Sequence, residues 1–455
     1  MESERKLENW LYVNKFGQIE LDRQKLYKHI KSQHIFYVTD KNCLFKYSEG
    51  YYQPLSRKQT YNIIKGYIPT EIRDKGDWVA IAEEFYTDSP DIKESDFNQD
   101  ENIVVFNNGV LHLDTGQLLK HSPKYLVTRK VNGNYLPEAA LDDAPVFSNF
   151  IHHLSQDGDE QFTVVSLVLE FIGAVLSCVK GWRFKKMLLL IGPGNTGKSK
   201  LRELVMNLIG LENCVSIDLK KINERFGTGA LHGKRLAGSG DMSYMAIEEM
   251  DTVKQLTGGD TLMAEFKGKD IFSFIYDGFL LCNANQLPYF RGDRGIHVYE
   301  RFLIVICNNV IPKEKRDPLL LDKLLMEKDI IASVSMRYLR DAIQRGYIFS
   351  ESDSMKSARE EYIVNNNSLL AFVKEGCEIG QGTILRSQFN RMYKIWCKIN
   401  NVQPERNKDI EPQLNEHLGI QSKKTGGCFK YSLCLTEEMF EVLNSATEDI
   451  KQGLR

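Results

Sequence analysis

The stretch "LLLIGPGNTGKSKL", Leu188–Leu201, decides the fold of the middle of this chain. It fits the pattern GxxxxGK[ST], with a short apolar run before it and residues of helical spacing after it. In that strand–loop–helix setting, glycines let the backbone curl so that its N–H groups point at phosphates, and the helix start adds a positive dipole. The stretch predicts a phosphate-binding loop made of Gly192, Gly194, Asn195, Thr196, Gly197, Lys198 and Ser199.

Such a loop works with a cation, a metal ion and a carboxylate. We expect Lys198 to reach the β- and γ-phosphates of ATP, and Ser199 to place its hydroxyl on Mg²⁺. A carboxylate at the end of a neighbouring strand completes the site, and "GKRLAGSGD" offers Asp241 as metal ligand and catalytic acid. Glu248 and Glu249 are reserve candidates, although "MAIEEMDTVKQL" has the pattern of a solvated helix. The predicted cofactors are ATP and Mg²⁺.

Two further positions are predicted to act in catalysis. "FLLCNANQLPYF", Phe279–Phe290, is an apolar strand that ends in asparagines, and an amide there can orient a water molecule without titrating. Asn285 is the first choice and Asn283 the second. In "RGDRGIHVYERFLIVI", Arg301 and Arg294 are candidates for a finger that reaches the nucleotide of a neighbouring subunit, because a guanidinium spreads positive charge over a transition state.

The segment between the acid and the asparagines distinguishes a motor from a kinase. In Leu256–Gly278, "LMAEF" and "IFSFI" are expected to be two strands around the turn "KGKD", which places Lys267 and Lys269 at the tip of a β-hairpin. Such a hairpin has little use in a small-molecule kinase. It suits a loop that grips a nucleic-acid backbone and moves with the state of ATP. The alternative is an ordinary exposed turn, where lysine is common.

Composition limits the classes of protein. The 455 residues suggest two to four domains, and 42% hydrophobic with 26% charged residues is ordinary for a soluble globular chain. With a formal net charge of −2, nucleic-acid binding must come from local basic patches. The nine cysteines include no close CxxC pair, so neither a zinc ribbon nor a disulfide framework is expected. The N-terminus lacks the apolar core of a signal peptide, and a cytoplasmic protein is expected.

The most apolar run, Phe162–Val179, approaches the length of a membrane span. Glu170 lies in its middle, however, and a charge there is costly in lipid. We therefore expect a helix that is buried under the nucleotide domain, and no membrane contact.

The runs "KMLLLIG", "GKRLAGSG", "GFLLCNA" and "RFLIVIC" are short and continuously apolar, as expected of parallel strands buried on both faces. They predict an α/β ATPase domain over residues 146–348. Residues 1–145 mix helix and strand signals, with hairpin strands expected in Phe36–Leu55 and a loop or linker in Ser89–Asn102. This N-terminal α+β domain is expected to act as an oligomerisation collar or as a second DNA contact.

Residues 358–455 are predicted to form a winged-helix domain. Amphipathic helices are expected in Arg386–Asn401 and Asn407–Ile420, followed by a hairpin in Gln421–Leu435. In such domains the second helix enters the major groove and the wing contacts the backbone. The phosphate contacts would come from Lys423, Lys424 and Lys430, and base contacts from Gln413, Asn415 or His417. A protein-docking module is the alternative, and Tyr393 and Trp396 are expected in the core.

The blocks "GPGNTGKS", "GKRLAGSGD", "LTGGDTLMAEFKGKD" and "LLCNANQLPYF", in this order and spacing, resemble motifs A, B, B′ and C of superfamily 3 helicases. The preceding "FNNGVLHLDTGQLLKHSPKYLVTRKV" resembles the segment ahead of the ATPase in phage- and plasmid-type primase-helicases related to the poxvirus primase-helicase. Among relatives, the Rep initiator helicases of staphylococcal mobile genetic islands look most similar in type. The sequence departs from the family at Met242, at Ala284 and in "YER", where relatives carry a second acid, a threonine and a double arginine.

The resemblance implies an AAA+ fold, a hexameric ring, ATP hydrolysis between subunits and 3′→5′ movement on single-stranded DNA. We therefore expect an ATP-dependent DNA helicase that binds double-stranded replication-origin DNA, unwinds it and works with a primase or other replication partners. Primase activity in this chain itself is not expected, because no zinc-ligand cluster or paired metal-binding carboxylates are visible. The alternatives are an ATP-switched DNA-binding assembly or helicase loader that never unwinds processively, and a small-molecule kinase.

Overall fold

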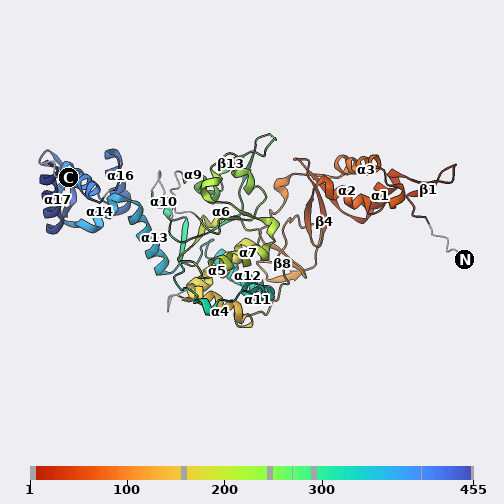
Figure 1. Ribbon diagram of the computed structural model, residues 1–455, viewed down its shortest axis with the longest axis horizontal. Helices are drawn as coiled ribbons and strands as arrows, with labels where there is room; N and C mark the ends of the chain where they lie inside the picture. Colours follow the sequence, from red (N-terminus) through yellow and green to blue (C-terminus); the bar gives the residue numbers. More distant parts are fainter. Residues whose placement is uncertain are drawn as a thin grey trace.

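The computed structural model describes residues 7–154, 161–242, 250–268, 270–287, 295–400 and 402–451. The molecule is elongated (Figure 1). Its N-terminal part lies at one end, a parallel sheet with surrounding helices forms the middle, and the C-terminal part lies at the other end, joined to the middle by helix α13 (Asp353–Asn366).

The N-terminal part contains a small hairpin and a four-stranded sheet in the order β5-β4-β3-β6. The hairpin strands expected in Phe36–Leu55 are confirmed. The expected loop after Ser89 contains a short strand that pairs with β3 in parallel. The elements are β1 (Leu11–Val13), β2 (Ile19–Leu21), α1 (Arg23–Gln33), β3 (Phe36–Thr39), β4 (Leu44–Ser48), β5 (Tyr51–Leu55), α2 (Arg57–Lys65), α3 (Lys75–Asp88) and β6 (Asp91–Ile92).

A second, three-stranded sheet is formed by β7 (Ile103–Phe106), β8 (Gly109–His112) and β9 (Gln117–Leu119). Its buried side chains, including Val104 and Leu111, belong to the same hydrophobic cluster as helices of the central part. This sheet is therefore packed onto the central part, whereas α1 to α3 enclose a separate cluster of their own.

The central sheet is five-stranded and parallel throughout, in the order β11-β12-β15-β10-β16. All four predicted strands are confirmed, and the sequence pattern missed only β11, which has three residues and lies at the edge. The strands are β10 (Met187–Ile191), β11 (Cys214–Ser216), β12 (Leu236–Gly238), β15 (Phe279–Ala284) and β16 (Phe302–Ile306).

Helices cover both faces of this sheet, and the fold class is mixed α/β as predicted. The helices are α4 (Pro145–Leu154), α5 (Gln161–Leu176), α6 (Gly181–Phe184), α7 (Lys198–Ile209), α8 (Leu219–Ile222), α9 (Asp251–Gly258), α10 (Ile296–Tyr299), α11 (Leu320–Met326) and α12 (Lys328–Gln344).

Helix α5 is buried, as predicted for the most apolar run. Its Glu170 is 1% exposed and accepts hydrogen bonds from the Arg345 guanidinium at 2.6 Å and from the Ser350 backbone N–H at 2.7 Å. These partners explain how a carboxylate is kept inside an apolar helix. None of the helices in the described part of the chain combines the length and apolar character that crossing a bilayer requires.

The predicted hairpin is confirmed. Strands β13 (Thr261–Ala264) and β14 (Phe272–Ile275) pair antiparallel, with Ala264 opposite Phe272. Lys267 lies exposed in the connecting turn, and Lys269 lies outside the described residues. In Figure 1 the hairpin projects from the central part beside the N-terminal sheet.

The C-terminal part has its own hydrophobic cluster, which includes Tyr393 and Trp396 as predicted. Its sheet has the order β17-β19-β18, and the hairpin expected in Gln421–Leu435 is confirmed. Strand β17 was not predicted. The elements are α14 (Ser368–Gly376), β17 (Cys377–Leu385), α15 (Arg386–Ile399), α16 (Asn407–Leu418), β18 (Lys423–Thr425), β19 (Cys428–Leu435) and α17 (Glu437–Lys451).

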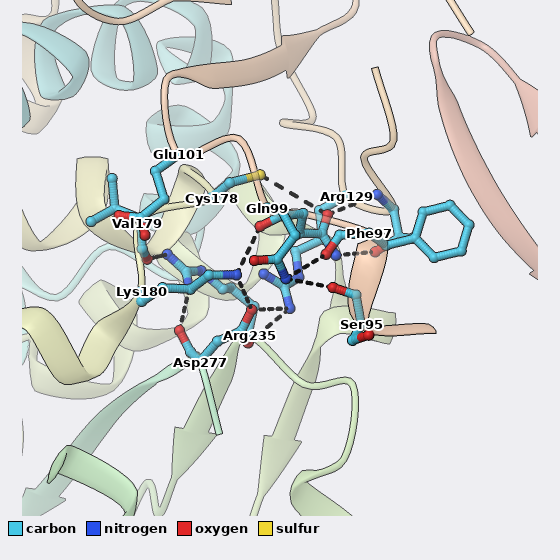
Figure 2. A network of polar contacts seen from close by, with 12 residues as sticks. Ser95, Phe97, Gln99, Glu101, Arg129, Cys178, Val179, Lys180, Arg235 and Asp277 are labelled. Carbon is cyan, nitrogen blue, oxygen red and sulfur yellow. Dashed lines mark hydrogen bonds and ion pairs between the residues drawn. The ribbon is translucent and has the colours of Figure 1, made fainter. Parts of the chain in front are cut away.

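A buried cluster of charges lies at the edge of the sheet where the parallel strands begin (Figure 2). Asp277 precedes β15, and its carboxylate is 3.0 Å from the Arg129 guanidinium and 3.7 Å from the Lys180 ammonium. Arg235 precedes β12, is fully buried and donates to the carbonyl oxygens of Ala174, Val175, Val179 and Asp277. The cluster therefore joins the segment after β9 to α5 and to two strands.

The opposite charges in this cluster stabilise one another's ionised forms. Burial alone would favour a neutral carboxylic acid at Asp277, but Arg129, Arg235 and Lys180 hold its pKa well below the usual range. Burial and the nearby Arg129 lower the pKa of Arg235 to about 10, so its guanidinium stays charged at neutral pH.

Arg235→Met should lower the free energy of unfolding by about 3–5 kcal/mol, because it removes a buried cation and leaves carbonyl groups without donors. The thermal midpoint would show this. The matched control is Arg183→Met. Arg183 is 38% exposed and pairs with Glu101 at 2.8 Å, so its replacement should lower the free energy of unfolding by about 1 kcal/mol or less. Equal shifts in the two variants would show that the cluster does not stabilise the fold.

Candidate nucleotide-binding site

The phosphate loop is fixed between two strand ends. The Gly192 N–H donates to Ala284 O at 3.1 Å, and the Cys307 N–H donates to Ile191 O at 2.6 Å. Gly192 has φ +148°, and a Cβ at that position would lie 2.1 Å from the Cys307 carbonyl oxygen. Only glycine fits so close to the backbone of the strand end after β16.

The middle of the loop is open, in contrast to its ends. A Cβ added at Gly194 would meet no heavy atom within 4 Å, and Asn195 adopts the left-handed conformation at φ 63°. At the far end Gly197 has φ 100° and a Cβ there would approach the Phe150 ring at 2.8 Å. The loop is thus open at Gly194 and tightly packed where it joins β10 and α7.

Lys198 and Ser199 lie in the first turn of α7. The Lys198 ammonium donates to the carbonyl oxygens of Gly192 and Pro193, each at 2.6 Å, and to Thr196 Oγ1 at 3.3 Å. Ser199 is exposed. Burial lowers the pKa of Lys198, while Cys307 and Asp241 act in the opposite direction. The lysine is therefore held against the loop, and the Asp241 carboxylate is near enough to affect it.

Asp241 lies just past the end of β12, exposed, at the rim of a hollow of about 470 Å³. Ser216, Asp218 and Ser239 line the same hollow. Sequence reasoning missed Asp218, which follows the short strand β11 and gave no motif signal. The alternative acids Glu248 and Glu249 lie outside the described residues.

The end of β12, just before Asp241, is held by close backbone packing at Gly238 and by hydrogen bonds from Arg202. A Cβ at Gly238, which has φ +141°, would lie 2.0 Å from Leu281 O of β15. Arg202, one turn after Lys198 and 9% exposed, donates to Gly238 O at 3.0 Å and to Ser216 Oγ at 2.7 Å. Arg202 therefore ties α7 to β11 and β12, which sequence reasoning did not find.

The two asparagines differ in environment. Asn285 follows β15 and is exposed at the same sheet edge as the phosphate loop. Asn283 is within β15 and 1% exposed, and no hydrogen-bond partner is found for its side-chain amide among the described residues. Its backbone N–H donates to Ser239 O at 2.9 Å and its carbonyl accepts from the Met242 N–H at 2.8 Å. Asn283 thus holds the chain on both sides of Asp241 in place.

Arg301 lies at the opposite edge of the sheet from the phosphate loop. It directly precedes β16, which runs parallel to β10 with Met187 opposite Phe302. Its guanidinium donates to Thr257 Oγ1 of α9 at 2.7 Å, and burial lowers its pKa. It therefore lies at the other edge of the sheet from the phosphate loop of its own chain, and its role as a finger stays a prediction. Arg294 lies outside the described residues.

The turn end of the β13–β14 hairpin, where Phe272 pairs with Ala264, contacts the N-terminal part. The Lys41 ammonium lies 4.9 Å from the centre of the Phe272 ring, 2.5 Å from Glu94 and 3.0 Å from His232 Nε2. The His232 ring packs edge-on against Phe272 at 4.9 Å. Lys41 and His232 lower the pKa of Glu94 to about 2 despite its burial. The tip with Lys267 is left exposed.

The predicted DNA-contacting residues of the C-terminal part fall into two groups. Lys423 and Lys424 are exposed on β18, and Lys430 is half-buried on β19 opposite Lys423. Those on α16 are already engaged. Gln413 accepts from Asn367 Nδ2 at 2.9 Å, Asn415 accepts from Gln421 Nε2 at 2.8 Å, and His417 is half-buried.

The residues present fit a nucleotide with a divalent cation. The open space at Gly194, the ammonium of Lys198 and the positive end of the twelve-residue helix α7 suit a polyphosphate. The exposed oxygen donors of Ser199 and Asp241 suit Mg²⁺. Within the described ranges there is no cluster of three or more His, Cys, Asp or Glu residues that could hold a metal ion.

Gly192→Ala should lower stability by about 1–3 kcal/mol and abolish nucleotide binding, because the added methyl group meets the Cys307 carbonyl and the backbone conformation favours glycine. Thermal unfolding and titration with a fluorescent ATP analogue would measure both effects. Gly194→Ala is the matched control and should keep its thermal midpoint. Equal thermal midpoints for the two variants would show that the loop is not constrained at Gly192.

Two family models match parts of the chain. "D5 N terminal like" matches residues 24–156, and a family of unknown function named DUF5906 matches residues 190–301, from the end of β10 to the start of β16. The chain therefore carries a D5-like N-terminal segment ahead of the phosphate loop, and the second match spans the loop, Asp241 and the hairpin.

Solved structures titled as the apo form of the NrS-1 C terminal region are similar to this chain at 13% and 14% identity, with TM-scores of 0.49 and 0.48. They cover 91% of this chain and 100% and 99% of theirs. The two family models, taken together, fit a phage- or plasmid-type, primase-helicase-like protein.

Proposed function

We propose that this chain is an ATP-dependent DNA helicase that assembles as a hexameric ring, moves 3′→5′ and opens a replication origin. In this proposal the central part is an AAA+ core and the C-terminal part is a winged-helix domain. The observation that carries it is the β13–β14 hairpin, which is inserted in the sequence between the strand that leads to Asp241 and the strand that leads to Asn285, with Lys267 exposed at its tip.

The strand order supports the nucleotide part of the proposal. Strand β10 lies between β15 and β16, so the phosphate loop opens beside Asn285, and β12 brings Asp241 to the same edge. Lys198 then binds the β- and γ-phosphates, and Ser199 and Asp241 hold Mg²⁺. When bound, Mg²⁺ would neutralise charge on the phosphates. Asn285 orients the attacking water, and Arg301 reaches the nucleotide of the next subunit.

The order of the C-terminal elements supports the winged helix. Helix α14 and strand β17 precede α15 and α16, and the β18–β19 hairpin follows as the wing, with Gly426 and Gly427 at φ 60° and 84° in its two-residue turn. The exposed Lys423 and Lys424 on this wing suit contact with a phosphate backbone.

An ATP-switched DNA-binding assembly or helicase loader is the second candidate. The same phosphate loop would serve it, but a switch does not need an exposed lysine at a hairpin tip. A small-molecule kinase is disfavoured for the same reason.

Lys198→Ala should abolish ATP turnover and, with it, displacement of a labelled strand from forked DNA. Lys200→Ala is the matched control, since Lys200 pairs with Glu203 at 2.8 Å on the next turn of the same helix and should leave both activities near wild type. Forks with a 3′ or a 5′ tail would test polarity. Robust ATP turnover without displacement on either fork would favour the loader.

Lys267→Ala should keep basal ATP turnover, because the hairpin tip is away from the phosphate loop, and should lose most strand displacement. Lys315→Ala, which removes an exposed lysine after β16, is the control. Displacement at the wild-type rate in the Lys267 variant would show that the hairpin does not grip DNA.

A further inference from the structure

A row of cations lies on the exposed face of α15. Arg391, Lys394 and Lys398 follow one another at helical spacings of three and four, and all three are exposed. Helix α15 contains no aspartate or glutamate. Within the described part of the chain, no ion pair or hydrogen bond engages any of the three side chains. Their charges are therefore available to an external anion.

These cations surround a hollow of about 550 Å³ between α15 and the start of α16. Ser387, Asn390 and Asn407 complete its polar lining, and no carboxylate is part of it. Asn407 is the first residue of α16, so the positive end of that twelve-residue helix points to the same place. The nearest acid in that turn, Asp409, is paired with Arg406 at 2.6 Å.

Helix α16 itself is poorly suited to face DNA. It carries Asp409, Glu411 and Glu416 against one lysine. Glu416 accepts a hydrogen bond from the backbone N–H of Ile296 at 2.9 Å, so this side of α16 is turned toward α10 of the central part. Figure 1 places α16 on the side of the C-terminal part that is nearer to α10. Its base-contacting candidates are thus engaged within the molecule.

We propose that the α15 groove, defined by Arg391, Lys394, Lys398 and Asn407, binds the phosphate backbone of DNA. The three cations extend over about 10 Å of helix, so that each of these long side chains can reach a phosphate of its own. The three cations suit a polyanion as ligand, and the choice of DNA as that polyanion rests on the proposed function. The groove adds sequence-independent affinity for DNA to that of the wing and does not read bases.

The test is binding of the full chain to labelled single-stranded and duplex oligonucleotides, followed by fluorescence anisotropy from 50 to about 200 mM salt. Arg391→Gln, Lys394→Gln and Lys398→Gln combined should weaken binding about tenfold or more to at least one form. The slope of log K against log salt should fall by about 2–3, since each lost phosphate contact removes about 0.7–0.9. The charge-preserving variant Arg391→Lys, Lys394→Arg, Lys398→Arg should restore binding.

Two charge-matched triple variants serve as controls. Lys28→Gln, Lys58→Gln and Lys75→Gln remove exposed lysines from the N-terminal part, and Lys423→Gln, Lys424→Gln and Lys430→Gln remove the wing lysines. The inference is overturned if the α15 variant keeps the affinity and salt slope of the N-terminal control, or if the wild type binds neither DNA form. An additional loss in the wing variant leaves the inference standing, because the wing is a separate surface.

The same proteins separate this inference from the proposed function. ATP turnover without DNA should be equal in all of them, since none of the substituted residues lies at the phosphate loop. A wild type that binds DNA through α15 but displaces no strand would refute only the helicase. Strand displacement by a wild type whose affinity is unchanged in the α15 variant would refute only the groove.

Discussion

The buried carboxylate of Asp277 is the constraint on which the central part depends. Arg129, Lys180 and Arg235 surround it, and each comes from a different segment of the chain. The cluster lies where the parallel strands begin and fixes the hairpin, α5 and the segment after β9 to one another. Because charges buried in this way are stable only as a complete set, these segments form one unit.

This arrangement gives the two edges of the sheet different surroundings. The edge where strands begin is filled with salt bridges and protein backbone, and it anchors the N-terminal segment and the hairpin. The edge where strands end carries the phosphate loop, Asp241 and Asn285, with open space at Gly194. In the proposed function, chemistry and mechanical connection are therefore separated by the length of the strands, and β12 and β15 run from one edge to the other.

Much of the fold could be predicted because its signals are local. Continuous apolar runs gave four central strands, the Lys-Gly-Lys-Asp turn gave the hairpin, and the glycine pattern gave the phosphate loop. Strand β11 and strand β17 were missed, because the first is too short and the second is mostly exposed. Arg202 and Asp218 resemble ordinary surface residues in the sequence. Only the hydrogen bond from Arg202 to Gly238 O, and the hollow that Asp218 shares with Asp241, place them at the site.

The contact between Lys41 and Phe272 ties the β13–β14 hairpin to the N-terminal part. Phe272 begins β14, so a swing of the hairpin about its base has to separate this ring from Lys41 or carry the N-terminal sheet with it. A cation–π contact and a partly exposed ion pair contribute about 0.5–1 kcal/mol each, close to the thermal energy. This contact is therefore weak enough to break at little cost, and the hairpin is held in addition by Arg225, Thr228 and His232 of the central part.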